Sequence, residues 1–150
     1  MKTCYGEFRI ATLREVAPDY TCDQPPKVRT YWDEVILPSI DVCKEHLFVL
    51  LLNNRCRILG HTMISMGTVN ECAAHPREVF RAAILAGSTT IIMIHNHPSG
   101  DPSPSEVDIK MTRRMIEVGK VVGIEVTDHV VMGDQRHCSL RQMGFIHRPD

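Results

Sequence analysis

The fourteen-residue stretch HNHPSGDPSPSEVD, residues 95–108, organises this sequence. It opens with two histidines, His95 and His97, which follow the apolar run TIIMI at residues 90–94. An apolar run without polar alternation is typical of a strand that is buried on both faces. Prolines and a glycine follow the histidines, and a segment with helical periodicity begins at Val107. The stretch therefore predicts a strand, a loop and a helix, with the histidines at the end of the strand.

The histidines and two residues of the predicted helix have the spacing of a metal site. Alternate side chains of an extended chain project to the same side, so His95 and His97 can face one ion. Ser105 and Asp108 are i,i+3 neighbours on one face of the predicted helix, and the loop can fold that face back over the histidines. His95, His97 and Asp108 would then supply two nitrogens and one carboxylate oxygen. Three protein ligands with a position left for water are typical of a catalytic zinc site, although other divalent metals also accept such ligands.

The limits of this helix are predicted from its flanking residues. Ser103 is expected to be the N-cap, with Pro104 in the first helical position and Glu106 completing a capping box. The helix is expected to run to about Val118, where Gly119 would end it.

Apolar runs and breaking residues predict the other elements. Residues 46–52 are a second strand buried on both faces, and residues 56–66 are its hairpin partner after a turn. The remaining predictions are helices at residues 30–37, 76–86 and 139–144 and a strand at residues 121–132. A hairpin combined with alternating strands and helices predicts an α+β (α/β three-layer) fold, in which a mixed β-sheet is flanked by helices.

The composition bounds the class of protein. A chain of 150 residues with 43% hydrophobic and 23% charged residues is typical of one ordinary globular domain. We expect residues 1–28 to be an arm, with a short edge strand at residues 8–13, packed on a domain that comprises residues 29–150. The net charge of -1 argues against a broad DNA-binding surface, so nucleic acid is not expected as a direct substrate.

The location of the protein is predicted from its apolar runs and its cysteines. No apolar run approaches the ~20 residues of a membrane span, and the N-terminal residues do not resemble a signal peptide. The six cysteines lack the paired spacing of a thiolate metal site or a redox pair. We therefore expect a cytoplasmic protein whose cysteines are reduced and mostly buried.

The central pattern, H-x-H, seven residues and S-x-x-D with an upstream glutamate, resembles the JAMM (MPN-plus) metalloprotease motif. The whole string at residues 95–108, followed by Asp128-His129, resembles the RadC branch of that superfamily, as does HPREVF at residues 75–80. The resemblance covers about residues 44–144. It implies a JAB/MPN (cytidine-deaminase-like) architecture, a Zn²⁺ cofactor and cleavage of a peptide or isopeptide bond by metal-activated water.

The resemblance also implies roles for single residues. His95, His97 and Asp108 would be the zinc ligands, and Ser105 would donate a hydrogen bond on the oxyanion side. The family's general base is a glutamate near the start of a buried strand before the histidines, a position that Glu45 matches. Two alternatives remain open: Glu71 lies in a loop that could approach the metal, and Glu78 lies in the first turn of a helix, where an acid has an ordinary dipole role.

Plainer interpretations stand beside these roles. The Ser105 hydroxyl could instead bind a free amide of the first helical turn, and Asp128-His129 could be a polar step in a strand rather than a pair behind the ligands. Full-length RadC proteins carry an additional N-terminal segment that resembles a helix-hairpin-helix module. The residues before Glu45 lack that pattern, so the sequence resembles a short, stand-alone form.

Two classes of function are therefore carried forward. The first is a zinc-dependent hydrolase that acts on an unidentified protein or peptide. The second is a non-catalytic metal-binding or partner-binding domain associated with DNA repair or mobile elements. A metal-dependent nuclease would need a basic groove that the net charge of -1 does not indicate.

Overall fold

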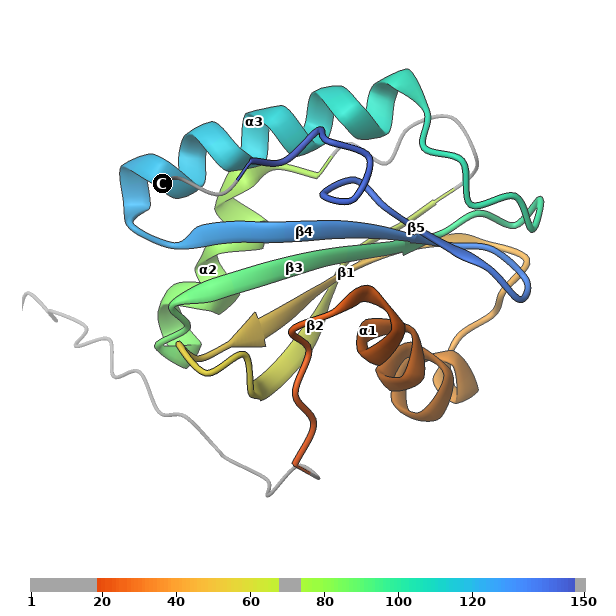
Figure 1. The fold of residues 1–150 in the computed structure, drawn as a ribbon, viewed down its shortest axis with the longest axis horizontal. Helices are drawn as coiled ribbons and strands as arrows, with labels where there is room; N and C mark the ends of the chain where they lie inside the picture. Colours follow the sequence, from red (N-terminus) through yellow and green to blue (C-terminus); the bar gives the residue numbers. More distant parts are fainter. Residues whose placement is uncertain (1–18, 68–73, 148–150) are drawn as a thin grey trace, which may run out of the picture.

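Five strands form one mixed sheet in the order β2-β1-β3-β4-β5. The computed structural model describes residues 19–67 and 74–147, so the expected edge strand at residues 8–13 lies outside the described residues. The strands are β1 (Glu45–Leu52), β2 (Ile58–Gly67), β3 (Thr90–Asn96), β4 (Glu125–Met132) and β5 (His137–Ser139). β1 is antiparallel to β2 and β3, β3 is parallel to β4, and β4 is antiparallel to β5 (Figure 1).

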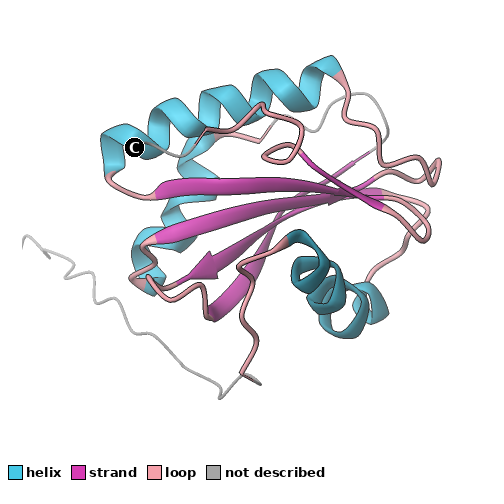
Figure 2. Cartoon of the chain, in the orientation of Figure 1, coloured by secondary structure: helices cyan, strands magenta, loops and turns pink. Residues whose placement is uncertain are grey.

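Helices cover both faces of the sheet, as the three-layer prediction requires. Helices α2 (Pro76–Ala86) and α3 (Glu106–Val122) pack on one face, and α1 (Pro25–Tyr31) packs on the other (Figure 2). Every residue of β1 is therefore buried, and its apolar run shows no alternation because neither face meets water. None of the described helices is both long and apolar enough to cross a membrane.

The helical segment before the sheet differs from the prediction in its start. Helix α1 begins at Pro25, and the helical path continues as a π-helical turn, η1 (Trp32–Ile36), and a 3-10 turn, η2 (Leu37–Ser39). The predicted start at Thr30 is wrong, because Pro25 and Pro26 open the helix instead of belonging to the predicted arm. Proline is well suited to a first helical turn, where its missing N–H would have no partner in any case. Before the helix, Thr21 bridges to Arg57 at the base of the β1–β2 hairpin.

Three further predictions were wrong. Helix α3 does not stop at Gly119 but at Gly123, which has φ 75° and closes the helix in the left-handed conformation. Gly119 is a packing residue instead, since a Cβ there would lie 2.5 Å from the carbonyl oxygen of Ile124. Residues 139–144 form the end of β5 and a series of turns rather than a helix, and of the four described cysteines only Cys22 is buried.

Two loops are packed against each other beside the carboxyl ends of β3 and β4. Gly133 follows β4, and a Cβ on it would overlap the carbonyl oxygen of Gly100, which also accepts a hydrogen bond from Asp134 N at 3.2 Å. Arg29 of α1 holds the far side of this contact through bonds to the carbonyl oxygens of Gly133 and Asp134 at 3.1 and 2.8 Å. Helix α1 therefore supports the loop after β4, against which the loop after the two histidines is packed.

Replacing Gly133 by alanine tests this support. The added Cβ must push the two loops apart, so we expect the free energy of unfolding to fall by about 1–3 kcal/mol. Gly60→Ala in β2 is the matched control, because a Cβ there meets nothing within 4 Å. It should leave stability unchanged or raise it by up to about 1 kcal/mol. Urea denaturation measures both variants, and equal stabilities would contradict the close packing of the loops.

Candidate metal centre

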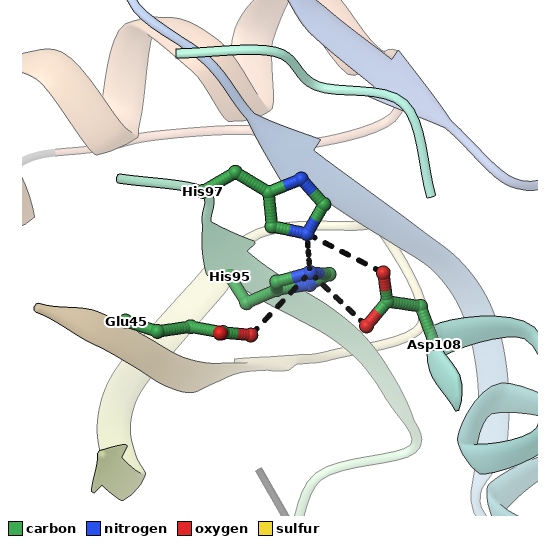
Figure 3. A group of neighbouring side chains, drawn as sticks. All are labelled: Glu45, His95, His97 and Asp108. Atoms are coloured by element: carbon green, nitrogen blue, oxygen red, sulfur yellow. Dashed lines mark hydrogen bonds and ion pairs between the residues drawn. The ribbon is translucent and has the colours of Figure 1, made fainter. Parts of the chain in front are cut away.

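Four side chains from three elements converge at one end of the sheet (Figure 3). Because β1 and β3 are antiparallel, the start of β1 lies beside the end of β3, and Leu47 is paired with His95. This pairing brings Glu45 next to the histidines, and the first turn of α3 brings Asp108 from the other side. One ligand atom from each of Glu45, His95, His97 and Asp108 lies within 4.8 Å of the others.

The distances show a compact set of nitrogen and oxygen atoms. The Nε2 atoms of His95 and His97 are 2.8 Å apart. Asp108 spans both rings, with Oδ1 at 3.3 Å from His95 Nε2 and Oδ2 at 3.4 Å from His97 Nε2. Glu45 Oε1 lies at 3.9 Å from His95 Nε2. His97 is the most accessible of the four, with 18% of its side chain exposed, whereas the other side chains are 1–9% exposed.

The outer nitrogen of each ring is already engaged, which leaves Nε2 for the centre. His97 Nδ1 lies 2.8 Å from the carbonyl oxygen of Asp101. A carbonyl can only accept, so Nδ1 carries the proton and the Nε2 lone pair of the neutral ring faces inward. His95 Nδ1 is engaged by a buried neighbour, since it lies 2.7 Å from His129 Nε2.

The chemistry of this donor set fits a cation. Two imidazole nitrogens and two carboxylates converge in a space with little exposure to water, where a positive charge between them would be favourable. Imidazole nitrogens and carboxylate oxygens are ligands that zinc and other divalent metals accept in proteins. The group could therefore hold a metal ion.

The electrostatics of the isolated protein agree with this reading. Burial opposes ionisation of Asp108, but the hydrogen bonds that His95 and His97 donate when their rings are protonated outweigh it and hold the pKa of its carboxyl well below the ordinary value. The hydrogen bond to Asp108 raises the pKa of His97. Burial raises the pKa of Glu45 despite the opposing charges of the two histidines. Complete burial lowers the pKa of His129 well below its ordinary value.

Comparison with known proteins gives the family. The model of the RadC-like JAB domain matches residues 22–145. The chain belongs to the RadC-like JAB domain family.

Relatives of this RadC-like domain are found in both archaea and bacteria. The UPF0758 protein of Methanococcoides burtonii is 42% identical over 144 residues, which are 92% of this chain and 63% of the relative. UPF0758 proteins of Desulforamulus reducens and Desulfitobacterium hafniense are 46% and 48% identical, over 71% and 69% of this chain and 47% and 45% of each relative. This RadC-like chain thus spans 45–63% of the length of these three relatives, whose names state no activity.

The structure separates the three candidate glutamates of this RadC-like domain. Glu45, at the start of β1, belongs to the group of possible metal ligands. Glu78 is exposed on α2 and lines a hollow with Thr62 and Arg81, and it is not a member of the group. Glu71 lies outside the described residues. Among the described glutamates, Glu45 is therefore the one that belongs to this group.

The start of α3 corrects the predicted capping box by two residues. The N-cap is Ser105, not Ser103, and helix α3 begins at Glu106. Ser105 Oγ accepts from Asp108 N at 3.1 Å, and Asp108 Oδ2 accepts from Ser105 N at 2.7 Å. Ser103 instead donates its hydroxyl to Asp101 Oδ1 at 2.8 Å. Pairs of the form S-x-x-D and S-x-x-E overlap in this sequence, and the position of Asp108 at the metal group selects the later one.

Several residues that support the site were not assigned to it from the sequence. Asn96, between the two histidines, accepts from His46 N at 2.9 Å and donates to Lys44 O at 2.9 Å, so it binds the backbone on both sides of Glu45. His129 contacts His95, although the expectation favoured a plain strand position. The pattern Asp128-His129 was the available signal. Asp128 has the structural role, since its carboxylate accepts hydrogen bonds from the Ser139 hydroxyl and the Arg141 amide within the fold.

The N-cap assignment is tested by two serine substitutions. Ser105→Ala removes the acceptor for Asp108 N, so we expect the free energy of unfolding of the metal-free protein to fall by about 1 kcal/mol. Ser103→Ala removes only an exposed bond and should change it by less than about 0.5 kcal/mol. Thermal unfolding followed by circular dichroism in a chelating buffer measures both. A larger loss in Ser103→Ala would restore the cap expected from the sequence.

Proposed function

We propose that this RadC-like domain is a zinc-dependent hydrolase of the JAMM type that cleaves a peptide or isopeptide bond. The observation that carries the proposal is the place of Glu45. Its carboxylate is not required to complete a three-ligand set, yet Oε1 lies 3.9 Å from the Nε2 atom of His95. A carboxylate held beside three metal ligands is where the hydrolysis of an amide needs a general base.

The ligands in this proposal are His95, His97 and Asp108. When bound, zinc would acidify a water molecule and polarise the carbonyl group of the scissile bond. The protein holds these ligands ready: the ring of His97 is fixed by Asp101 O, and the carboxylate of Asp108 is fixed by Ser105 N. Little rearrangement is needed to receive the ion.

Glu45 acts as the base. Its carboxyl is largely shielded from solvent and lies beside the proposed ligands, where a base for the attacking water has to stand. Oε1 takes the proton of the attacking water and passes it to the nitrogen of the leaving amine. Asn96 keeps the carboxylate in place through its bonds to Lys44 O and His46 N.

Ser105 is the proposed donor on the oxyanion side. Its Oγ uses a lone pair to accept from Asp108 N, and its hydroxyl proton has no acceptor among residues 19–67 and 74–147. The hydroxyl can therefore donate to a developing oxyanion while the serine remains the helix cap. The capping and catalytic roles of Ser105 are compatible.

The substrate in this proposal is a protein or peptide rather than nucleic acid. The net charge of -1 gives the chain no overall attraction to a phosphate backbone. The competing function is a domain that binds zinc but cleaves no substrate, and the experiment below distinguishes the two functions.

The proposal is tested with zinc analysis and a peptide library. Wild type and Glu45→Gln should each bind about one zinc ion, and His97→Ala should lose it, because His97 supplies one of the three ligands. Zinc-loaded wild type should cleave members of a mixed peptide library, and Glu45→Gln should reduce the rate by about 100-fold or more. Mass spectrometry of the new termini measures cleavage.

Glu78→Gln is the matched control, because it makes the same change on an exposed glutamate outside the group. It should keep both zinc and activity. Full zinc retention in His97→Ala would contradict the proposed ligand set. Cleavage at the wild-type rate by Glu45→Gln would remove Glu45 as the base, and a zinc-loaded wild type that cleaves no peptide would favour the non-catalytic domain.

A further inference from the structure

We propose that His129 is a positioning residue of the metal centre, which holds His95 in the tautomer that presents Nε2 to the ion. His129 belongs to a buried hydrogen-bond relay that runs from His95 through His129 and Thr112 to the backbone of Asp108. The inference rests on the proposed metal site, and it adds two residues that lie behind the ligands.

The relay is short and enclosed. His95 Nδ1 lies 2.7 Å from His129 Nε2, and His129 Nδ1 lies 2.6 Å from Thr112 Oγ1. Thr112 Oγ1 donates to Asp108 O at 2.7 Å. The relative exposures of His95, His129 and Thr112 are 1%, 0% and 1%. Water is thus excluded, and each polar atom depends on its neighbour in the relay.

The direction of the relay follows from its end. The Asp108 carbonyl can only accept, so the Thr112 hydroxyl spends its single proton there and must accept from His129 Nδ1–H. A neutral His129 then has a lone pair on Nε2, which accepts from His95 Nδ1–H. A neutral His95 with its proton on Nδ1 has its lone pair on Nε2, the atom that faces the metal group. The reverse order would place two lone pairs against each other at the threonine.

The relay also links the elements that carry the ligands. His95 lies at the end of β3, His129 lies on the parallel neighbour β4, and Thr112 follows Asp108 by one turn of α3. Both ends of the relay are therefore metal ligands. A ring nitrogen of one ligand and the backbone of another are held in one hydrogen-bonded unit, which orients His95 relative to Asp108.

Substitutions that keep or remove the acceptor test the relay by zinc affinity. His129→Leu leaves His95 Nδ1–H without an acceptor, which favours the tautomer with the proton on Nε2, where it competes with the ion. We expect zinc to bind about 10- to 100-fold more weakly, measured against a chelator of known affinity. His129→Gln, whose side-chain oxygen can reach the place of Nε2, should restore affinity to near that of wild type.

Thr112 gives a sharper test, because it contacts neither the ion nor His95. Thr112→Val keeps the shape of the side chain but removes the acceptor for His129 Nδ1–H, so His129 is driven to the tautomer that no longer accepts from His95. Zinc affinity should fall as in His129→Leu. Thr112→Ser keeps the hydroxyl and should bind zinc like wild type.

A spectroscopic measurement reports the tautomer directly. Long-range ¹H–¹⁵N correlation spectra of the metal-free protein, recorded at a pH where the rings are neutral, should show the His95 proton on Nδ1 in wild type and Thr112→Ser. The same spectra of Thr112→Val should show it on Nε2. Thermal unfolding of each variant confirms that the comparison is made between folded proteins.

The outcomes separate this inference from the proposed function. A wild type that binds no zinc would overturn the metal site itself. A wild type that binds zinc, beside a folded Thr112→Val that binds equally well, would overturn the relay and leave the proposed function standing. If His129→Leu does not fold, the two threonine variants decide the question. A His129→Gln variant as weak as His129→Leu would overturn the acceptor role of His129.

Discussion

The antiparallel pairing of β1 with β3 is the constraint on which the site depends. It places the start of one strand beside the end of the other, so that Glu45 and His95, far apart in the sequence, become neighbours. Asn96 locks this arrangement, because its amide binds the backbone on both sides of Glu45. Asn96, which lies between the two histidines, thus helps to set the position of Glu45.

Asp108 joins the start of a helix to the metal group. One of its oxygens accepts from the N-cap amide, and both lie within 3.4 Å of a histidine nitrogen. The geometry that begins α3 is therefore the geometry that presents Asp108 to the two histidines. The carboxylate is also well placed electrostatically, since a negative charge in the first turn of a helix is favoured by the helix dipole.

Local patterns predicted most of the fold for a clear physical reason. The runs at residues 47–52 and 91–94 are uniformly apolar because both sheet faces are covered, and β1 and β3 were found there. The errors lie where two local signals compete. Pro25 suits a helix start as well as an extended path, and Gly119 and Gly123 each could have ended α3. Packing against Ile124 decides between the two glycines.

The sequence by itself determined the chemical class of the site. His95, His97, Ser105 and Asp108 are close in the chain, so their spacing and the strand, loop and helix between them predict which atoms can share an ion. Only the tertiary structure decided which described glutamate joins them, which serine caps α3, and that His129 and Thr112 stand behind the ligands. Those choices depend on distances through space between strands and helices, which periodicity along the chain does not encode.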